Sequence, residues 1–211
     1  MVTVHYFYDP MCGWCYGATP LIESIVNNGR YQLVLHPGGM LPAKSIAPSF
    51  RQHIVNSDQR ISELTGAQFG QRYIERVTSN EELVLDSYLP TRAILVGESL
   101  GLAPFEILKT IQKAHYIEGK PVNTLASLEA LAVQLGLDQQ LWREKMNTGK
   151  TLEDDAINTS HQMMTRLSVQ GYPTLIIEDK GQFKRLPHTE YYGRTEQWNT
   201  LLESQPNALL R

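Results

Sequence analysis

The chain contains two cysteines, Cys12 and Cys15, which are separated by Gly13 and Trp14. Two cysteines placed at random in 211 residues would fall three positions apart on the order of one time in a hundred, so the spacing needs a reason. Sulfurs at this spacing can close a small disulfide ring, so that one thiol attacks a substrate disulfide and the other releases the product. The pair therefore predicts thiol-disulfide exchange.

The roles of the two thiols follow from the strand that we predict before them and the helix that we predict after them. Unpaired N–H groups at the start of the helix favour a thiolate on Cys12, the expected catalytic nucleophile. Cys15 lies one turn later on the same face and is the expected catalytic resolving thiol, deeper in the fold. Gly13 and Trp14 are expected to bind substrate, with Trp14 as an apolar surface. Neither residue supplies a cation, which favours moderate oxidising power.

Two other uses of the cysteines are open at this point. A zinc site would need two more ligands, and the six histidines show no HxxxH or similar spacing that would supply them. Two inert cysteines in a hydrophobic core are the second alternative, because buried cysteine is often structural. We expect no metal, and no cofactor beyond the redox-active dithiol itself.

The elements that position the dithiol begin with a strand over residues 2–8, where β-branched and aromatic residues alternate until Asp9-Pro10. Apolar residues recur at helical spacing over residues 14–26, and Pro20 predicts a kink in this helix. Residues 31–35 predict a second strand. This order is half of a small α/β unit and indicates a parallel strand pair joined by a helical crossover.

The segment 45–168 is predicted to be helical, because it contains several helical patterns of apolar residues and no convincing alternating pattern typical of a strand. Ser87 and Thr124 are the predicted N-caps of two of these helices. The apolar faces of the helices predict an insertion with its own core. The predicted helices are separated at Gly66, Thr78-Ser79-Asn80, Gly101, Gly119-Lys120-Pro121 and Gly136.

Strand character returns near the end of the chain. Residues 174–178 and 183–186 predict two strands joined by a turn over residues 179–182. Residues 195–202 predict a last amphipathic helix, with Trp198 and two leucines facing inward. The order of elements is therefore an α/β sheet interrupted by helices.

The composition excludes several classes of function. The chain is 42% hydrophobic and 19% charged, which is typical of a soluble globular protein. A net charge of -3, with lysine and arginine scattered along the chain, predicts no nucleic-acid partner. No stretch approaches the roughly 20 apolar residues of a membrane helix, so no membrane partner is expected. Residues 1–6 show no secretory signal, which predicts a cytoplasmic location.

Two segments carry a resemblance to a known family. Residues 9–17, DPMCGWCYG, resemble the active-site segment of the DsbA-like oxidoreductases, especially the cytoplasmic branch often called FrnE-like. Residues 169–174, VQGYPT, match that family's Val-x-Gly-x-Pro-Thr loop. Residues 114–119 and 128–137 also look like the family's helical insertion. The resemblance covers nearly the whole chain.

The resemblance implies an α/β, thioredoxin-like fold with a large helical insertion. Residues 1–44 and 169–211 would form the thioredoxin-like domain, and residues 45–168 the inserted helical subdomain. It also implies a cis peptide bond before Pro173, in a loop that lies against the dithiol. There the main chain of Tyr172 can pair with an extended substrate segment. Tyr172 and Pro173 are therefore expected to bind substrate, and the expected partners are thiol- or disulfide-containing proteins.

The expected function is that of a thiol-disulfide oxidoreductase or isomerase, and a reducing cytoplasm suits reduction, isomerisation or stress repair. Two alternatives remain open. The first is a glutathione-dependent transferase or isomerase of the related kappa-class or chromene-carboxylate isomerase type, in which glutathione would be the co-substrate. Such relatives usually have serine in the first catalytic position. The second is a chaperone-like binding protein whose helices grip unfolded chains.

Three further positions allow more than one interpretation. We interpret Asp9 as a turn residue before proline, with a base beside Cys15 as the alternative. We interpret His115 as a satisfied or exposed helix histidine rather than as part of a cleft. The Gly38-Gly39-Met40 segment is either a border of the substrate groove or a plain loop.

Overall fold

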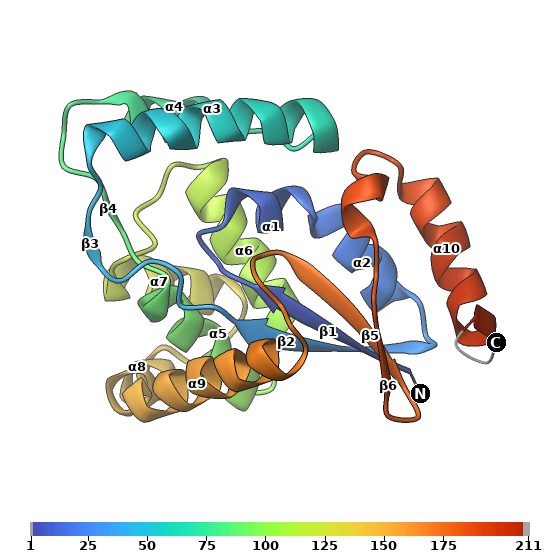
Figure 1. Ribbon diagram of the computed structural model, residues 1–211. Helices are drawn as coiled ribbons and strands as arrows, with labels where there is room; N and C mark the ends of the chain where they lie inside the picture. Colours follow the sequence, from blue (N-terminus) through green and yellow to red (C-terminus); the bar gives the residue numbers. More distant parts are fainter. Residues whose placement is uncertain (1, 209–211) are drawn as a thin grey trace.

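The centre of the molecule is a mixed four-stranded sheet, seen in a computed structural model that describes residues 2–208 (Figure 1). The strands lie in the order β2-β1-β5-β6. β1 pairs in parallel with β2, and the two later strands are antiparallel to their neighbours. The strand predictions and the parallel pair are confirmed. The bounds are Val2–Tyr8 for β1, Tyr31–Pro37 for β2, Thr174–Asp179 for β5 and Gln182–Arg185 for β6.

Successive side chains of β1 alternate between two hydrophobic cores, as the pleat of a strand requires. Val4 and Tyr6 belong to the larger core, together with residues of α2 (Thr19–Asn27) and α10 (Thr195–Ala208). Phe7 belongs to a smaller core that is covered by methionines of α9 (Lys150–Arg166). Helices therefore cover both faces of the sheet, which accounts for the almost continuous burial of β1.

The predicted helix over residues 14–26 is in fact two helices, α1 (Gly13–Gly17) and α2. The break falls at Ala18, and Pro20 lies in the first turn of α2, where a missing N–H costs nothing. The single kinked helix was therefore the wrong prediction, although the proline does mark the irregular point. The helix that begins at the dithiol is consequently short.

The inserted segment contains seven helices among the described residues, and the expected breaks between its first helices are confirmed. Gly66 and Gly136, for example, follow α3 and α7 with φ of 76° and 87°, which glycine adopts without strain. The bounds are Pro48–Thr65 for α3, Gln71–Thr78 for α4, Tyr88–Ser99 for α5, Pro104–Tyr116 for α6, Leu125–Gln134 for α7, Gln139–Thr148 for α8 and Lys150–Arg166 for α9.

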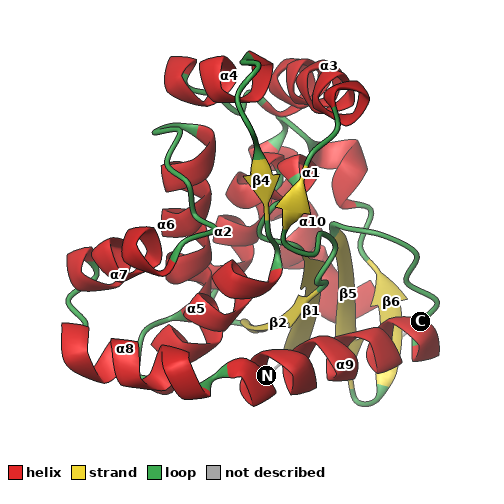
Figure 2. Cartoon of the chain, turned by 90° about the vertical axis from the view of Figure 1, so that its left-hand side faces the viewer, coloured by secondary structure: helices red, strands yellow, loops and turns green. Residues whose placement is uncertain are grey.

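The insertion also contains two short strands that the sequence did not predict. β3 (Lys44–Ser45) and β4 (Val84–Leu85) pair antiparallel and join the two ends of the α3–α4 hairpin to the body of the molecule. Figure 2 shows α3 and α4 above this small sheet. An alternating pattern cannot be recognised in two residues, so only the pairing reveals these strands.

The prediction that the insertion has its own core is only partly right. A small cluster that includes Tyr73, Val77 and Leu85 lies wholly within it. However, buried residues of α5 to α8, such as Leu108 and Trp142, belong to the same continuous core as the sheet. The proposed boundaries of the two parts, at residues 44/45 and 168/169, stay a prediction.

The N-cap predictions have different outcomes at the two positions. The hydroxyl of Thr124 caps α7 by accepting a hydrogen bond from Ser127 N, as expected. Ser87 precedes α5, but its hydroxyl donates to the carboxyl group of Asp9 instead of capping the helix. At the end of the chain, the predicted helix is confirmed as α10, and Trp198 is fully buried with its indole N–H donating to Leu21 O.

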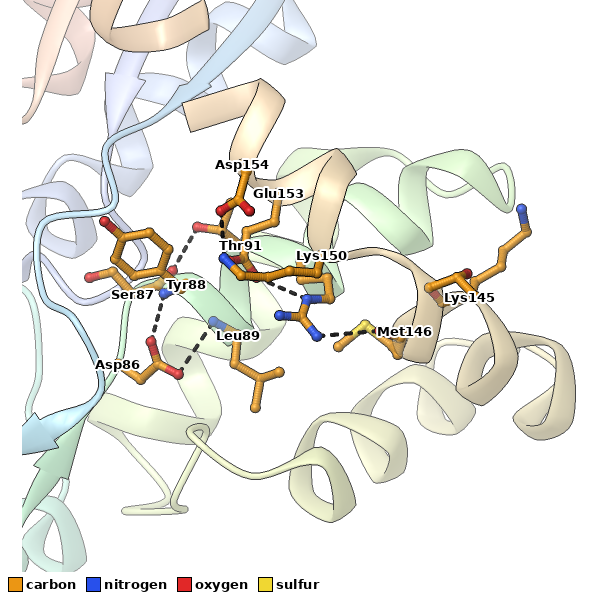
Figure 3. A network of polar contacts seen from close by, with 12 residues as sticks. Asp86, Ser87, Tyr88, Leu89, Thr91, Lys145, Met146, Lys150, Glu153 and Asp154 are labelled. Atoms are coloured by element: carbon orange, nitrogen blue, oxygen red, sulfur yellow. Dashed lines mark hydrogen bonds and ion pairs between the residues drawn. The ribbon is translucent and has the colours of Figure 1, made fainter. Parts of the chain in front are cut away.

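A buried ion pair joins α5 to α9 (Figure 3). Arg92 Nε donates to Glu153 Oε2 at 2.9 Å, and Glu153 is completely inaccessible to solvent. Lys150 donates to the other oxygen of Glu153 at 2.6 Å. Removing one partner of a buried pair is costly because the remaining charge has lost its hydration.

Arg92→Met should therefore lower the free energy of unfolding by about 3 kcal/mol, since Glu153 keeps only its contact with Lys150. Urea unfolding followed by circular dichroism measures the loss. Arg143→Met is the matched control, because it removes the exposed partner of Glu129 and should have a much smaller effect. Equal losses in the two variants would contradict a structural role for the buried pair.

Candidate active site

The dithiol lies where β1 ends and α1 begins. Cys12 is the N-cap residue of α1, with an extended backbone, and its carbonyl accepts a hydrogen bond from Tyr16 N at 3.1 Å. Both cysteines are free thiols. Cys12 is 7% exposed and Cys15 is 1% exposed, so Cys15 lies deeper in the fold. This is the arrangement that the order of elements predicted, although the helix behind it is a single short one.

The environment of Cys15 favours its protonated form. Burial raises the pKa of the Cys15 thiol well above its ordinary value, and a hydrogen bond with Cys12 raises it further. A neutral thiol at this depth does not compete for substrates, because only a thiolate attacks disulfides. The difference in burial therefore separates the two sulfurs as a nucleophile and a resolving thiol would require.

The loop before β5 lies against the first sulfur. The Tyr172-Pro173 peptide bond is cis, as the family resemblance implied. Cys12 Sγ lies 3.7 Å from the carbonyl oxygen of Tyr172 and donates to it. The Tyr172 ring covers Gly38, where an added Cβ would come within 2.4 Å of the ring. Two segments at opposite ends of the chain thus meet at Cys12.

A cleft of about 320 Å³ opens beside Cys12. Of the predicted substrate-binding residues, Gly13, Trp14 and Tyr172 line it. The Trp14 ring stacks on Tyr192, with ring centroids 5.7 Å apart. Met40 also lines the cleft and is 42% exposed, whereas Gly38 and Gly39 are not among the lining residues. The roles of all these residues in substrate binding stay predictions.

The opposite wall of the cleft is formed by residues of α3, α4 and α6 that sequence reasoning missed. Asp58 and Tyr73 line it, and the Tyr73 hydroxyl donates to Asp58 Oδ2 at 2.7 Å. α3 can approach α1 closely because Gly13 and Gly17 face it: added Cβ atoms would come within 2.9 Å and 2.7 Å of Ile61. In the sequence, the one indication of this contact was the placement of Gly13 and Gly17 on either side of Cys15, four residues apart.

Burial also shifts the pKa values of Asp58 and His115 in this wall. It raises the pKa of Asp58 to about 6, against a smaller opposite effect of the Tyr73 hydrogen bond. It lowers the pKa of His115 to about 3, so this histidine is neutral near pH 7. His115 is 3% exposed and its Nδ1 has no hydrogen-bond partner among the described residues. The interpretation of His115 as a satisfied or exposed histidine outside the cleft was therefore wrong.

Asp9 does more than form a turn. It is completely buried, and its carboxyl oxygens accept hydrogen bonds from Met11 N at 2.9 Å, Met40 N at 2.7 Å and Ser87 Oγ at 2.6 Å. The bond to Met11, two residues on, is the expected turn contact. The other two bonds tie the dithiol to the loop after β2 and to the start of α5. Burial raises the pKa of Asp9, and the three donors act in the opposite direction.

Residues 2–208 contain no group of three or more histidine, cysteine, aspartate or glutamate side chains placed to hold a metal ion. Within the same residues, no helix combines the length and the apolar character needed to cross a membrane.

The structure has a four-stranded sheet, a dithiol after the first strand, a cis-proline loop that faces the dithiol, and helices inserted between these two segments. These features define a thioredoxin fold with a helical insertion. The family model described as a DSBA-like thioredoxin domain matches residues 3–190. The chain belongs to this DsbA-like family, which confirms the predicted fold class and the resemblance. A comparison with curated proteins gave no match.

Solved structures similar to this chain include a disulfide reductase and a more distant isomerase. The cytosolic disulfide reductase DsbM from Pseudomonas aeruginosa is 33% identical, with a TM-score of 0.90 over 98% of this chain and 99% of that one. A structure of DsbM with GSH is 32% identical, with a TM-score of 0.89 over 97% and 99% of the two chains. A 2-hydroxychromene-2-carboxylate isomerase is 15% identical, with a TM-score of 0.57 over 98% of each chain, and shares the fold alone.

Asp9→Asn should lower the free energy of unfolding by about 1–3 kcal/mol, because the amide N–H₂ would face donors where the carboxylate accepts. Ser87→Ala removes only one of the three bonds and should cost less. Urea unfolding at neutral pH measures both. A stability of Asp9→Asn equal to that of the unmodified chain would show that these hydrogen bonds do not hold the site.

Asp58 makes the stability of the folded chain depend on pH. Its folded-state pKa of about 6 is raised above the unfolded value, so its contribution to stability is present below the unfolded pKa and is lost as pH rises through about 6. Asp58→Asn should therefore match the unmodified chain near pH 4 and be more stable by about 2 kcal/mol near pH 7.5. Urea titrations at the two pH values measure this, and a pH-independent difference would contradict the shift.

Proposed function

We propose that this chain is a thiol-disulfide oxidoreductase that exchanges disulfides with protein substrates through Cys12 and Cys15. The observation that supports this best is the placement of Cys12 Sγ at the start of a helix, 3.7 Å from the carbonyl oxygen before the cis proline. A sulfur in this position is open to the cleft on one side, and Cys15 lies one turn behind it. The coarser statement, that the chain is a DsbA-like protein, rests on the family match.

The reaction in the reducing direction has two steps. The Cys12 thiolate attacks one sulfur of a substrate disulfide, a mixed disulfide forms, and the other substrate sulfur leaves as a thiolate and takes up a proton. Cys15 then loses its proton, attacks Cys12 Sγ and releases the second substrate thiol. The dithiol becomes a disulfide and two electrons pass to the substrate. A thiol reductant such as glutathione would return the protein to the dithiol.

Four residues around the sulfurs would bind the substrate. Trp14 and Gly13 offer the surface beside Cys12, and both line the cleft. The main chain of Tyr172, which precedes Pro173, would pair with an extended substrate segment as an added strand. Such main-chain pairing does not depend on the side chains of the substrate segment.

Reduction in the cytoplasm is the direction and location that the observations favour. No lysine or arginine side chain lines the cleft in the described part of the chain, so nothing there stabilises a thiolate as a cation would. DsbM, at 33% identity over nearly the whole length, is a cytosolic disulfide reductase. The DsbM structure with GSH supports glutathione as a co-substrate. A reducing compartment keeps such a pair largely as a dithiol.

Cysteine substitutions test this function. Cys12→Ser should lower the rate of insulin reduction by about 100-fold or more, because a hydroxyl is a far weaker nucleophile than a thiolate. Cys15→Ser should retain the first step and accumulate a mixed disulfide with the substrate, visible on a non-reducing gel. Insulin turbidity with glutathione as reductant measures the rate.

The same variants separate the alternatives. The transferase or isomerase type would be favoured by two results together: the unmodified chain does not reduce insulin, and Cys12→Ser turns over glutathione as fast as the unmodified chain does. Unchanged suppression of aggregation in Cys12→Ser, again without insulin reduction in the unmodified chain, would favour a chaperone-like binding protein. Either result would overturn the proposed exchange activity.

A further inference from the structure

Asp58 is a buried carboxyl group beside the nucleophile that the two-step mechanism does not use. It is 8% exposed and lies in α3, across the cleft wall from the dithiol turn. A Cβ added to Gly13 would come within 3.0 Å of Asp58 Oδ1, so this oxygen lies against the residue that follows Cys12. Asp58 and Cys12 line the same cleft.

One oxygen of this carboxyl group has no partner. The Tyr73 hydroxyl donates to Oδ2 at 2.7 Å, whereas no hydrogen bond or ion pair within residues 2–208 reaches Oδ1. Carboxylates this deeply buried are normally paired with a cation or with several donors, because the loss of hydration is costly. Oδ1 is not among the fully buried polar atoms that lack a partner, so it is accessible and can accept a hydrogen bond from a group that enters the cleft.

The cleft supplies no compensating positive charge. Its lining among the described residues contains no lysine or arginine, and buried His115 is neutral near pH 7 because its pKa is about 3. His53 is exposed at the rim, where its ring stacks on Phe50. Most of the remaining wall is apolar or aromatic. An unpaired acid in such a wall attracts a positively charged ligand and repels a negative one.

We propose that the cleft selects disulfides that carry an ammonium or guanidinium group close to the reacting sulfur, with Asp58 Oδ1 accepting the hydrogen bond of that cation. This inference rests on the proposed exchange activity and names its substrate class. Two sources share the chemistry: the disulfide of a small aminothiol, or a protein disulfide with lysine or arginine next to the cysteine. Asp58 determines specificity in both cases.

Asp58 takes no part in bond making. Cys12 Sγ bonds to the sulfur of the cation-bearing half, the substrate S–S bond breaks, and the other half leaves as a thiolate that takes a proton from water. Cys15 then attacks Cys12 Sγ and releases the cation-bearing thiol, so that two electrons have passed from the dithiol to the substrate. The ion pair with Asp58 holds the cation-bearing half during approach and in the mixed disulfide.

The test compares three small disulfides of similar size with the pre-reduced chain: cystamine, which is positive, bis-hydroxyethyl disulfide, which is neutral, and dithiodipropionate, which is negative. The rate constant for each disulfide is divided by the rate constant for the reaction of a small neutral thiol with the same disulfide. This normalisation removes the differences in intrinsic reactivity among the three disulfides. We expect the normalised rate for cystamine to exceed that for dithiodipropionate by about tenfold, as one partly buried ion pair would give. The preference should fall to about twofold or less in Asp58→Asn.

Two controls accompany these rates. Glu63→Gln removes a charge from the exposed side of the same helix and should keep the preference of the unmodified chain. The rate with bis-hydroxyethyl disulfide shows whether Asp58→Asn is folded and reactive.

A pair of disulfide-linked peptides with lysine or glutamine beside the cysteine distinguishes the two sources of the cation. A preference for the lysine peptide identifies protein disulfides. Its absence together with a cystamine preference identifies small aminothiols. Both results support the proposal.

The outcomes also separate this proposal from the function on which it rests. Equal normalised rates for the three disulfides in the unmodified chain overturn the selection of cations and leave the exchange activity intact. An unchanged preference in Asp58→Asn overturns the role of Asp58. Failure of the pre-reduced chain to react with any of the disulfides overturns the exchange activity itself.

Discussion

The carboxyl group of Asp9 is the contact on which the geometry of the site depends. Its oxygens accept hydrogen bonds from the dithiol turn at Met11, from the loop after β2 at Met40 and from the start of α5 at Ser87. These segments belong to the sheet and to the inserted helices, so one side chain holds the dithiol in position relative to both. Desolvation of the carboxylate opposes this arrangement, and the three donors offset it only in part, since the pKa of Asp9 stays raised.

The same residue acts on the resolving thiol in two opposite ways. The backbone of Asp9 forms a hydrogen bond that favours the Cys15 thiolate, while the charge of its carboxyl group disfavours it. Burial outweighs both and keeps the pKa of Cys15 well above its ordinary value. Cys15 is therefore held neutral next to Cys12, as the proposed role of resolving thiol requires. The two sulfurs differ in their depth in the fold and not in residue type.

Elements whose signals are local were predictable from the sequence, and elements that depend on distant contacts were not. β1 and the breaks after α3 and α7 follow from alternation and from glycine, both visible within a few residues. The interruption at Ala18 was missed because the apolar spacing continues across it. β3 and β4 exist only through pairing between Lys44–Ser45 and Val84–Leu85, which no short window of sequence contains.

The same distinction between local and distant signals applies to the residues of the candidate site. Cys12 and Cys15 form a spacing with a chemical meaning, and the Tyr172-Pro173 loop has a family pattern. Asp58 carries neither signal, because a single aspartate in a polar helix looks like a solvated residue. Its burial arises only when α3 packs over Gly13, a contact between residues far apart in the chain.

The electrostatics of the cleft connect its specificity with the direction of electron flow. A dithiol acts as a strong oxidant when nearby positive charge stabilises the thiolate of its reduced form. Here two carboxyl groups flank the pair instead, Asp9 behind Cys15 and Asp58 over Gly13, and no lysine or arginine of the described chain lines the cleft. The charge of Asp9 disfavours the Cys15 thiolate, in the direction that the proposed reducing role requires. The unpaired acid Asp58 adds a second negative group to the same cleft, where it would attract a cationic substrate.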